Sequence, residues 1–496
     1  MERRVWLSNG TVVDGTGLSE FVGDVWLQGG RIIGVFARDG AVDAAEQAEL
    51  ADWKVQNPLQ IDCTAKVIAP GFIDVHTHDD AAALNSPAML PKLSQGVTTV
   101  IAGNCGISLA PVVTAHPPAP LSLLGDQQFR FGSMQDYAAA VNAAQPSINI
   151  AALLGHTSLR IKHMADLSRP ANAAEREAMA QDMHEAMQAG ALGLSSGIFY
   201  REAYAADMQE LVAVATVAAR HGGVYATHIR DELEGILEAM LEAAGTAQQS
   251  GLPLVLSHHK CAGSANWGRT LQTLPLVDKL AQQQELSMDV YPYTAGSTVL
   301  REDLVDGVID ILITRSEPHP EVGGRYLRDI AADWGISEYD ACVRLKPGNA
   351  CYFQMREDDV ERVIRHPLAM IGSDGLPNDE RPHPRLWGAF PRVLAMYWRD
   401  KGVLSLAQAV HKMTGMSAQR FRMADRGLLA AGKAADVVVF DPARIQDQAT
   451  FENPKQRSVG VEAVWVNGVL SYTEEAGALP ARAGRFVRRA AACAAA

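Results

Sequence analysis

The pattern of apolar and polar positions divides the chain into a middle part and two similar ends. Over residues 1–62, short apolar runs alternate with Asn-Gly and Gly-Gly dipeptides, which is typical of β-hairpins. These runs are residues 5–7, 11–13, 24–27 and 31–35. The same style returns at residues 435–440 and 461–466, and Asn467-Gly468 follows the second run. We therefore expect one small β-sandwich domain built from both termini, residues 1–62 and 431–482.

Between these ends, apolar runs of strand length alternate with long Ala-, Leu- and Glu-rich stretches of helical character. This alternation predicts repeated βα units around a parallel sheet. Eight strand candidates end near His78, Gly103, His156, Ser196, His228, His258, Tyr291 and Asp374. Eight parallel strands predict an α/β fold, a (β/α)8 TIM-like barrel over residues 63–430. Because polar residues close most of these strands, we expect the functional site at the C-terminal mouth of the barrel.

Two segments depart from the regular alternation. The interval from Tyr291 to Asp374 is much longer than one crossover needs, so we expect residues 296–350 to form an insertion over the barrel mouth. Two interpretations of this insertion are open: it forms a lid, or it is a structural segment without a catalytic role. Residues 483–496 are basic and then Ala-rich, which predicts a flexible tail.

Composition restricts the partners more than the fold. Of the 496 residues, 48% are apolar and 20% charged, as in an ordinary globular protein with a large core. The net charge of −13, without any long basic stretch, argues against nucleic acid or acidic lipid as a partner. The sequence shows neither an apolar leader nor the roughly 20 apolar residues of a membrane span, so we expect a cytoplasmic protein. The oligomeric state stays open.

Candidate chemistry begins at the end of the first barrel strand, where the chain reads Gly-Phe-Ile-Asp-Val-His76-Thr-His78. An extended chain repeats every two residues, so both imidazoles project from one face. Six scattered cysteines lack the spacing of a disulfide framework and are expected as reduced thiols. One of them, Cys105, follows the second strand, and His228 and His258 close the fifth and sixth.

A thiolate and two imidazoles from different strands suit Zn²⁺ and leave a fourth position for water or substrate. Cys105, His228 and His258 supply this set. His76 and His78 then hold a second ion or complete a weaker site. Asp374 has two available roles, ligand or general base, and we favour the base because it can return a proton to a leaving nitrogen. An Asp374 that only caps the following loop is the structural alternative.

These residues resemble the amidohydrolase superfamily and, within it, the N-acyl-D-amino-acid deacylases, or D-aminoacylases. The likeness spans roughly residues 60–440 and rests on Gly71-Phe-Ile-Asp-Val-His-Thr-His78, Gly103-Asn-Cys-Gly106, Gly155-His-Thr157, Gly193-Leu-Ser-Ser-Gly197, Thr227-His-Ile-Arg-Asp-Glu232, Ser257-His-His-Lys260, Asp289-Val-Tyr-Pro-Tyr-Thr-Ala-Gly-Ser297, Gly372-Ser-Asp374 and Gly432-Lys-Ala-Ala-Asp-Val437. Cys105 is the residue that best distinguishes D-aminoacylases from dihydropyrimidinase-like relatives, because the latter use a carbamylated lysine on strand 4. Here strand 4 offers Ser195-Ser196 instead.

The resemblance implies one tightly bound zinc on Cys105, His228 and His258, and a weaker second site at His76 and His78. It implies that a water activated by zinc attacks an amide carbonyl carbon, and that protonated Asp374 then donates to the departing amine. Tyr200 is the candidate second donor to the oxyanion. Its alternative is an aromatic ring packed against the barrel mouth.

For substrate binding, the resemblance implies that an α-carboxylate is held by Lys260, Tyr291, Ser297 and Arg385. Arg301 is a separate hypothesis: a buried arginine needs an anion, which predicts N-acyl-D-glutamate as the preferred substrate and N-acyl-D-aspartate next. Its alternative is a solvated arginine paired with Glu302 or Asp303. The D preference comes from the family likeness alone. Two interpretations compete with this one: a broad D-aminoacylase for apolar side chains, and a catalytically silent zinc-binding barrel.

Overall fold

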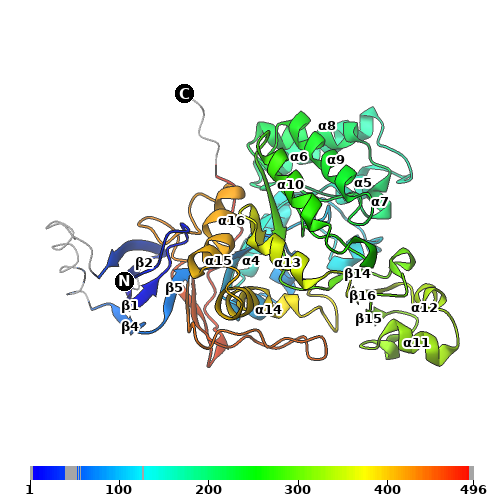
Figure 1. The fold of residues 1–496 in the computed structure, drawn as a ribbon. Helices are drawn as coiled ribbons and strands as arrows, with labels where there is room; N and C mark the ends of the chain where they lie inside the picture. The colour runs from blue at the N-terminus through cyan, green and yellow to red at the C-terminus, as the bar shows by residue number, and fades with distance from the viewer. Residues whose placement is uncertain (1–3, 39–52, 54, 56, 126–127, 491–496) are drawn as a thin grey trace.

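The computed structural model describes residues 4–38, 53, 55, 57–125 and 128–490. Figure 1 shows a barrel with peripheral helices in the middle, a sheet made of blue and orange-red strands on one side, and a yellow-green lobe on the other. The described helices include none that is long and apolar enough to span a membrane. The arrangement agrees with the predicted fold class, an α/β barrel with a β-domain built from both termini and an insertion.

The barrel strands lie in two parallel runs. One run is β6-β7-β8 and the other is β9-β10-β11-β12-β13-β17. Their bounds are β6 (Phe72–Asp74), β7 (Val97–Ala102), β8 (Asn149–Ala152), β9 (Leu154–Gly155), β10 (Gly193–Gly197), β11 (Val224–His228), β12 (Leu254–Leu256), β13 (Leu286–Val290) and β17 (Ala369–Ile371). Only Leu153 separates β8 from β9, so the two runs are continuous there. The parallel bridge between Thr77 and Gly375 joins the outer ends and closes the barrel.

Alternate residues of these strands point inward and fill the barrel. One buried cluster contains Ile73, Ile101, Val224 and Val255 of the barrel strands. Met416 and Phe421, which lie outside these strands, belong to the same cluster. The opposite faces pack against the surrounding helices, so most strands read as continuous apolar runs rather than alternating ones. The polar ends of the strands therefore remain at the mouth.

Helices follow the strands and cover the barrel (Figure 1). They are α2 (Ala82–Asn85), α3 (Leu90–Leu93), α4 (Met134–Ala144), α5 (His156–His163), α6 (Ala173–Gln188), α7 (Arg201–Tyr204), α8 (Met208–Arg220), α9 (Ile236–Ser250), α10 (Thr270–Ala281), α13 (Glu357–Arg365), α14 (Arg385–Arg392), the π-helix η5 (Val393–Asp400), α15 (Leu406–Met413) and α16 (Gly415–Arg420), with short 3₁₀ turns η1 (Leu121–Leu124) and η2 (Ser264–Asn266). Local signals set several boundaries. Asn172 and Glu175 form a capping box at the start of α6, for example.

Strands from both termini form one connected sheet. Its order is β21 (Gly477–Ala478), β20 (Val469–Thr473), β19 (Val461–Val466), β18 (Val437–Phe440), β5 (Val67–Pro70), β1 (Arg4–Val12), β2 (Phe21–Gln28) and β3 (Arg31–Ala37), and β4 (Leu59–Asp62) pairs with β1. Two expectations need correction. Asn9-Gly10 does not end a strand, because Asn9 takes a φ of 64° in a bulge and β1 continues. β5 also belongs to this sheet, although the expected boundary placed residues from 63 onward in the barrel.

The insertion forms a lobe with its own core. It contains β14 (Gly296–Val299), η3 (Glu302–Leu304), β15 (Ile311–Ser316), η4 (Pro320–Val322), α11 (Leu327–Trp334), α12 (Glu338–Arg344) and β16 (Gly348–Tyr352). The antiparallel sheet β14-β16-β15 packs on the helices through Ile311, Ile313, Leu327 and Ile330. β14 carries Ser297 to the barrel mouth, and β16 carries Tyr352 there. The lobe therefore contributes directly to the site.

The predicted flexible tail packs on the barrel over its described part. Phe486 and Val487 are buried, and backbone hydrogen bonds join Arg485 and Val487 to Ile150 of β8. Phe486 and Val487 form an apolar pair that packs beside the buried strand β8, and the basic residues around them gave no sign of this packing. Residues 491–496 lie outside the described residues.

Candidate metal centre and active site

Three of the predicted site residues take a backbone conformation that is rare for side chains with a Cβ. Cys105, His258 and Asp374 have φ values of 54°, 36° and 50°. Each follows the end of a barrel strand, β7, β12 or β17, where the chain turns away from the mouth. Strain of this kind persists when the surrounding structure imposes it, and it is concentrated at functional sites. Here the turns aim a thiol, an imidazole and a carboxylate into one space.

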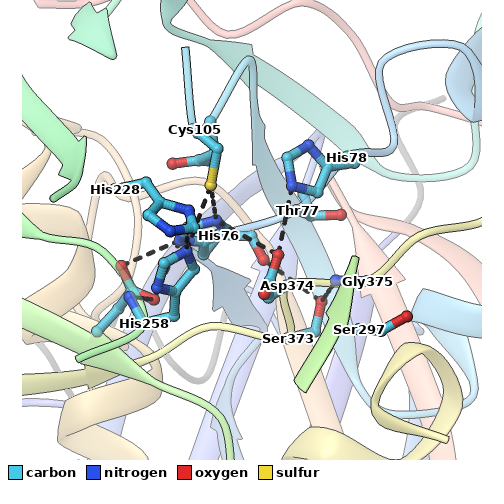
Figure 2. Close-up of polar contacts among 12 residues, drawn as sticks. His76, Thr77, His78, Cys105, His228, His258, Ser297, Ser373, Asp374 and Gly375 are labelled. Carbon is cyan, nitrogen blue, oxygen red and sulfur yellow. Dashed lines mark hydrogen bonds and ion pairs between the residues drawn. The ribbon is translucent and has the colours of Figure 1, made fainter. Parts of the chain in front are cut away.

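Cys105, His228 and His258 form the first group of potential ligands. Cys105 Sγ lies 3.4 Å from His258 Nε2, and His258 Nε2 lies 3.1 Å from His228 Nδ1. Figure 2 shows the Cys105 sulfur directed toward these two rings and toward His76. A tetrahedral zinc with ordinary Zn–N and Zn–S bonds separates its ligand atoms by roughly 3.3–3.7 Å. The separations of 3.4 and 3.1 Å are close to this range, and all three ligand atoms lie within 4.8 Å of one another, so one such ion fits with small shifts of the rings.

The second group shares the thiol with the first. It contains His76, His78, Asp374 and again Cys105. His76 Nε2 lies 3.2 Å from Cys105 Sγ, and His78 Nε2 lies 3.3 Å from Asp374 Oδ1. Both contacts are drawn as dashed lines in Figure 2. Cys105 is thus placed between two adjoining ligand sets. The sequence pattern pointed to two sets but not to a thiol that both could share.

The charge state of these groups suits a cation. Burial opposes ionisation of the Cys105 thiol, but His76 and His258 hold its pKa well below the usual range. Burial also opposes ionisation of Asp374, whereas the Arg385 guanidinium and a hydrogen bond from His78 hold the pKa of that carboxyl well below normal. The pocket therefore presents a thiolate and a carboxylate.

Two buried acids orient the imidazoles, and sequence reasoning gave neither a role. Glu232 Oε1 lies 3.1 Å from His258 Nδ1, and Asp289 Oδ2 lies 3.2 Å from His76 Nδ1. Histidine ligands commonly pair their second ring nitrogen with a carboxylate in this way. The available signal was a carboxylate within a few residues of a strand end, four positions after His228 and two before Tyr291.

The residues expected to bind a carboxylate gather on the other side of the cavity. Arg385 stacks over the Tyr291 ring at 4.6 Å, and its NH2 group donates to the Ser297 carbonyl at 3.3 Å. The Tyr291 hydroxyl, the Ser297 hydroxyl and the Arg385 Nε and NH1 groups are buried without a hydrogen-bond partner. Ser297 lies apart from the ligand network in Figure 2. Buried donors without partners are rare in folded proteins, so this cluster is suited to an anionic ligand.

Lys260 lies between the two regions. Its ammonium donates to Glu232 Oε1 at 2.6 Å and lies 2.9 Å from His258 Nδ1. It also lines the cavity, 5.9 Å from the centre of the Tyr291 ring. Lys260 can therefore orient a ligand histidine and still present charge to the cavity.

Tyr200 lies beside the first ligand group. Its ring centre is 5.3 Å from that of His228, and both residues line the cavity. Burial and the Cys105 thiolate raise the pKa of the Tyr200 phenol well above its usual value. At neutral pH Tyr200 is consequently a hydrogen-bond donor.

Arg301 and His156 lie outside this arrangement of groups. Arg301 does not line this inner cavity: it pairs with Asp303, with Nε 2.9 Å from Oδ1, and stacks at 4.0 Å over Phe199. It lies in the outer hollow that leads to the cavity, which is the alternative set out for it above. His156 also stays away from both ligand groups, because its Nε2 pairs with Glu210 at 2.8 Å.

Comparison with known proteins identifies the family of the chain. The model of the amidohydrolase family matches residues 60–292 and 340–472. The chain belongs to the amidohydrolase family. The interval between the two matched ranges, residues 293–339, contains most of the lobe.

Relatives of this amidohydrolase cover nearly its full length. A D-aminoacylase of Alcaligenes xylosoxydans xylosoxydans is 46% identical, with 98% of each chain covered. An N-acyl-D-glutamate deacylase of the same organism is 42% identical over 97% of this chain and 96% of its own. The crystal structure of N-acyl-D-glutamate deacylase from Bordetella bronchiseptica, complexed with zinc and a phosphonate inhibitor, is 41% identical with a TM-score of 0.90 and covers 98% of this chain and 100% of its own.

Proposed function

We propose that this amidohydrolase is a zinc-dependent deacylase that cleaves the amide bond of N-acyl-D-amino acids to a carboxylate and the free D-amino acid. The observation that carries the proposal is a pair of facing groups in one cavity. On one side a thiolate and two imidazoles converge, and on the other Tyr291, Ser297 and Arg385 present buried donors without partners. A metal-activated hydrolase for an amide with a neighbouring carboxylate needs both. The D configuration rests on the relatives.

Cys105, His228 and His258 would hold the tighter zinc, and His76 and His78 would hold the weaker ion. The donor set fits, because thiolate and imidazole are zinc ligands and Cys105 Sγ, His258 Nε2 and His228 Nδ1 converge in one buried space. Bound there, Zn²⁺ would polarise the amide carbonyl and lower the pKa of a water.

The chain itself supplies proton transfer and charge stabilisation. The ionised Asp374 carboxylate accepts a proton from the attacking water and returns it to the leaving nitrogen, which balances the reaction. The Tyr200 hydroxyl donates to the carbonyl oxygen as negative charge develops on it. Burial of both residues keeps bulk water from competing for these contacts.

Arg385, with Tyr291 and Ser297, orients the substrate through its α-carboxylate. A guanidinium is a strong donor to a carboxylate, and the buried, unpaired Arg385 Nε and Nη1 groups are each available to donate to a carboxylate oxygen. Binding the carboxylate beside Asp374 also brings the scissile amide next to the general base, since Arg385 NH2 lies 2.9 Å from Asp374 Oδ2.

The side-chain preference has two candidates. N-acyl-D-glutamate, followed by N-acyl-D-aspartate, requires Arg301 to leave Asp303 and reach inward past Phe199. N-acyl-D-amino acids with apolar side chains suit the cavity wall as it stands, because Leu233, Leu304 and Tyr352 line it. We place the acidic substrate first because the Arg301 cation lies in the outer hollow, with its side chain 25% exposed, and stacks on the cavity residue Phe199.

The test is a hydrolysis screen of zinc-loaded enzyme with N-acetyl-D-Glu, N-acetyl-D-Asp, N-acetyl-D-Met and their L counterparts. We expect turnover of D substrates only, with the acidic ones first. Arg301→Met should then lower kcat/KM for N-acetyl-D-Glu by about 10- to 100-fold and leave N-acetyl-D-Met nearly unchanged. Arg315→Met, at an arginine 40% exposed on the outer hollow, is the matched control.

Different results would contradict the deacylase activity and the role of Arg301. Zinc binding without hydrolysis of any D substrate would contradict the deacylase and favour a binding protein. An acidic preference that persists in Arg301→Met would remove Arg301 as the selecting residue and leave the deacylase intact.

A further inference from the structure

The seam that closes the barrel differs from the other strand contacts. β6 and β17 share no regular ladder among the described residues, and the Thr77–Gly375 bridge is accompanied by hydrogen bonds from Asp374 N to His76 O and from His78 N to Gly375 O. These two strands carry His76 and His78 on one side and Asp374 on the other (Figure 2). The alignment of the two strands therefore sets how the second ligand group meets.

A buried polar cluster lies directly behind this seam. The Lys92 ammonium, on α3, donates to Asp74 Oδ2 at 2.7 Å and to Ser373 Oγ at 2.9 Å, and lies 3.0 Å from Asp79 Oδ2. Asp74 also accepts from Ser373 N at 2.8 Å and from Ser373 Oγ at 2.6 Å. Lys92, Asp74 and Ser373 are completely buried.

The partners of Lys92 are the sequence neighbours of the ligand group. Asp74 precedes His76 by two residues, Asp79 follows His78, and Ser373 precedes Asp374. One ammonium thus connects both sides of the seam. Lys92 is not among the described residues that line the inner cavity, so it acts on the site only through these partners.

We propose that Lys92 is a positioning residue for the reaction: with Asp74, Asp79 and Ser373 it aligns the His76-Thr-His78 strand with Asp374, and so determines binding of the second, weaker cation and placement of the general base. The inference rests on the proposed function only in taking His76, His78 and Asp374 as a cation and proton site. A lysine that served stability alone would not need partners on both ligand-bearing strands.

Lys412 provides a matched control. It is 5% exposed and donates to the carbonyl oxygens of His366 and Ala369, at the start of β17 and the opposite end from Asp374. Both lysines are therefore buried, hydrogen-bonded and attached to the same strand. Lys412→Met should lower stability without changing metal binding.

The experiment titrates the metal-free forms of wild type, Lys92→Met, Lys92→Arg, Ser373→Ala and Lys412→Met with Zn²⁺ by calorimetry. Loss of a residue that supports a metal ligand typically lowers affinity about 10- to 100-fold, and we expect this for the weaker ion in Lys92→Met, with the tighter ion changed by less than about threefold. Lys92→Arg, which keeps the charge, should recover part of the loss. Ser373→Ala should show a smaller loss in the same direction.

Kinetics adds a second readout. In Lys92→Met, kcat should fall with little change in KM, because the carboxylate-binding side of the cavity is untouched while Asp374 is misplaced. A Lys92→Met protein that matches Lys412→Met in zinc isotherm and kcat would overturn the proposal, whatever its stability. If Lys92→Met does not fold, a wild-type isotherm for Ser373→Ala overturns it equally. The zinc isotherms decide the matter even if N-acyl-D-amino acids are not the substrates.

Discussion

At the scale of one side chain, Tyr200 offers the most direct test of charge stabilisation. Its hydroxyl remains protonated at neutral pH and lies on the His228 side of the cavity. Tyr200→Phe keeps the ring and removes the donor, so kcat should fall by about 10²- to 10³-fold with KM nearly unchanged. Steady-state kinetics on N-acetyl-D-Glu measures both. A raised KM with an unchanged kcat would show instead that the ring only packs against the substrate.

Residue types at strand ends predicted most of the candidate site, because the type of a side chain determines whether it can bind a metal. Cys105, His228, His258, His76, His78 and Asp374 could all be named from their type and position, and the structure brings them together. Partnerships could not be predicted in the same way. Glu232 and Asp289 gain their roles from contacts between different strands, and Arg301 has its own close partner, Asp303.

At the scale of elements, the count of apolar runs predicted the barrel because each buried strand is short, apolar and followed by a helix. Pairing partners were harder. β5 reads as a barrel strand since all four of its residues are buried, yet its hydrogen bonds go to β1 and β18. Asn9-Gly10 has the sequence of a turn but forms a bulge within β1. Composition alone cannot distinguish these outcomes, because they depend on the neighbouring strand.

The contact between α5 and α8 predicts a pH dependence of stability. Glu210 on α8 pairs with His156 and Arg160 on α5. Burial opposes its ionisation, but these partners lower the pKa of Glu210 from 4.5 to about 2. The folded-state pKa lies below the unfolded one, so the stabilisation is complete above pH 4.5 and disappears as the pH falls toward 2.

Glu210→Gln should therefore be less stable than wild type at pH 7 by on the order of 3 kcal/mol, and the gap should narrow between pH 5 and about 3. Urea denaturation across this range measures the gap. Glu317→Gln, at an acid 53% exposed and paired with Arg315, should show almost no gap at any pH. A constant gap for Glu210→Gln would mean that the contact is steric rather than ionic.

At the scale of the whole molecule, the proposed zinc site connects distant parts of the chain. Cys105 follows β7, His228 ends β11 and His258 follows β12, so an ion held by all three binds the folded barrel and not the unfolded chain. Linkage then stabilises the fold by about 2.7 kcal/mol when free zinc is 100 times its dissociation constant. Removing zinc with a chelator should lower the Tm, and restoring it should reverse the change.

Cys105→Ser separates this linkage from nonspecific effects of metal, because both ligand groups share that one sulfur. A hydroxyl is a far poorer zinc ligand than a thiolate, so the variant should show little zinc-dependent rise in Tm at concentrations that stabilise wild type. Cys261→Ser, at a buried cysteine outside both groups, should respond to zinc as wild type does after its own loss of packing is subtracted. Calorimetric scans of the three proteins with and without zinc give the comparison. An equal zinc shift in Cys105→Ser and wild type would place the stabilising ion elsewhere and remove the thiolate from the centre of the mechanism.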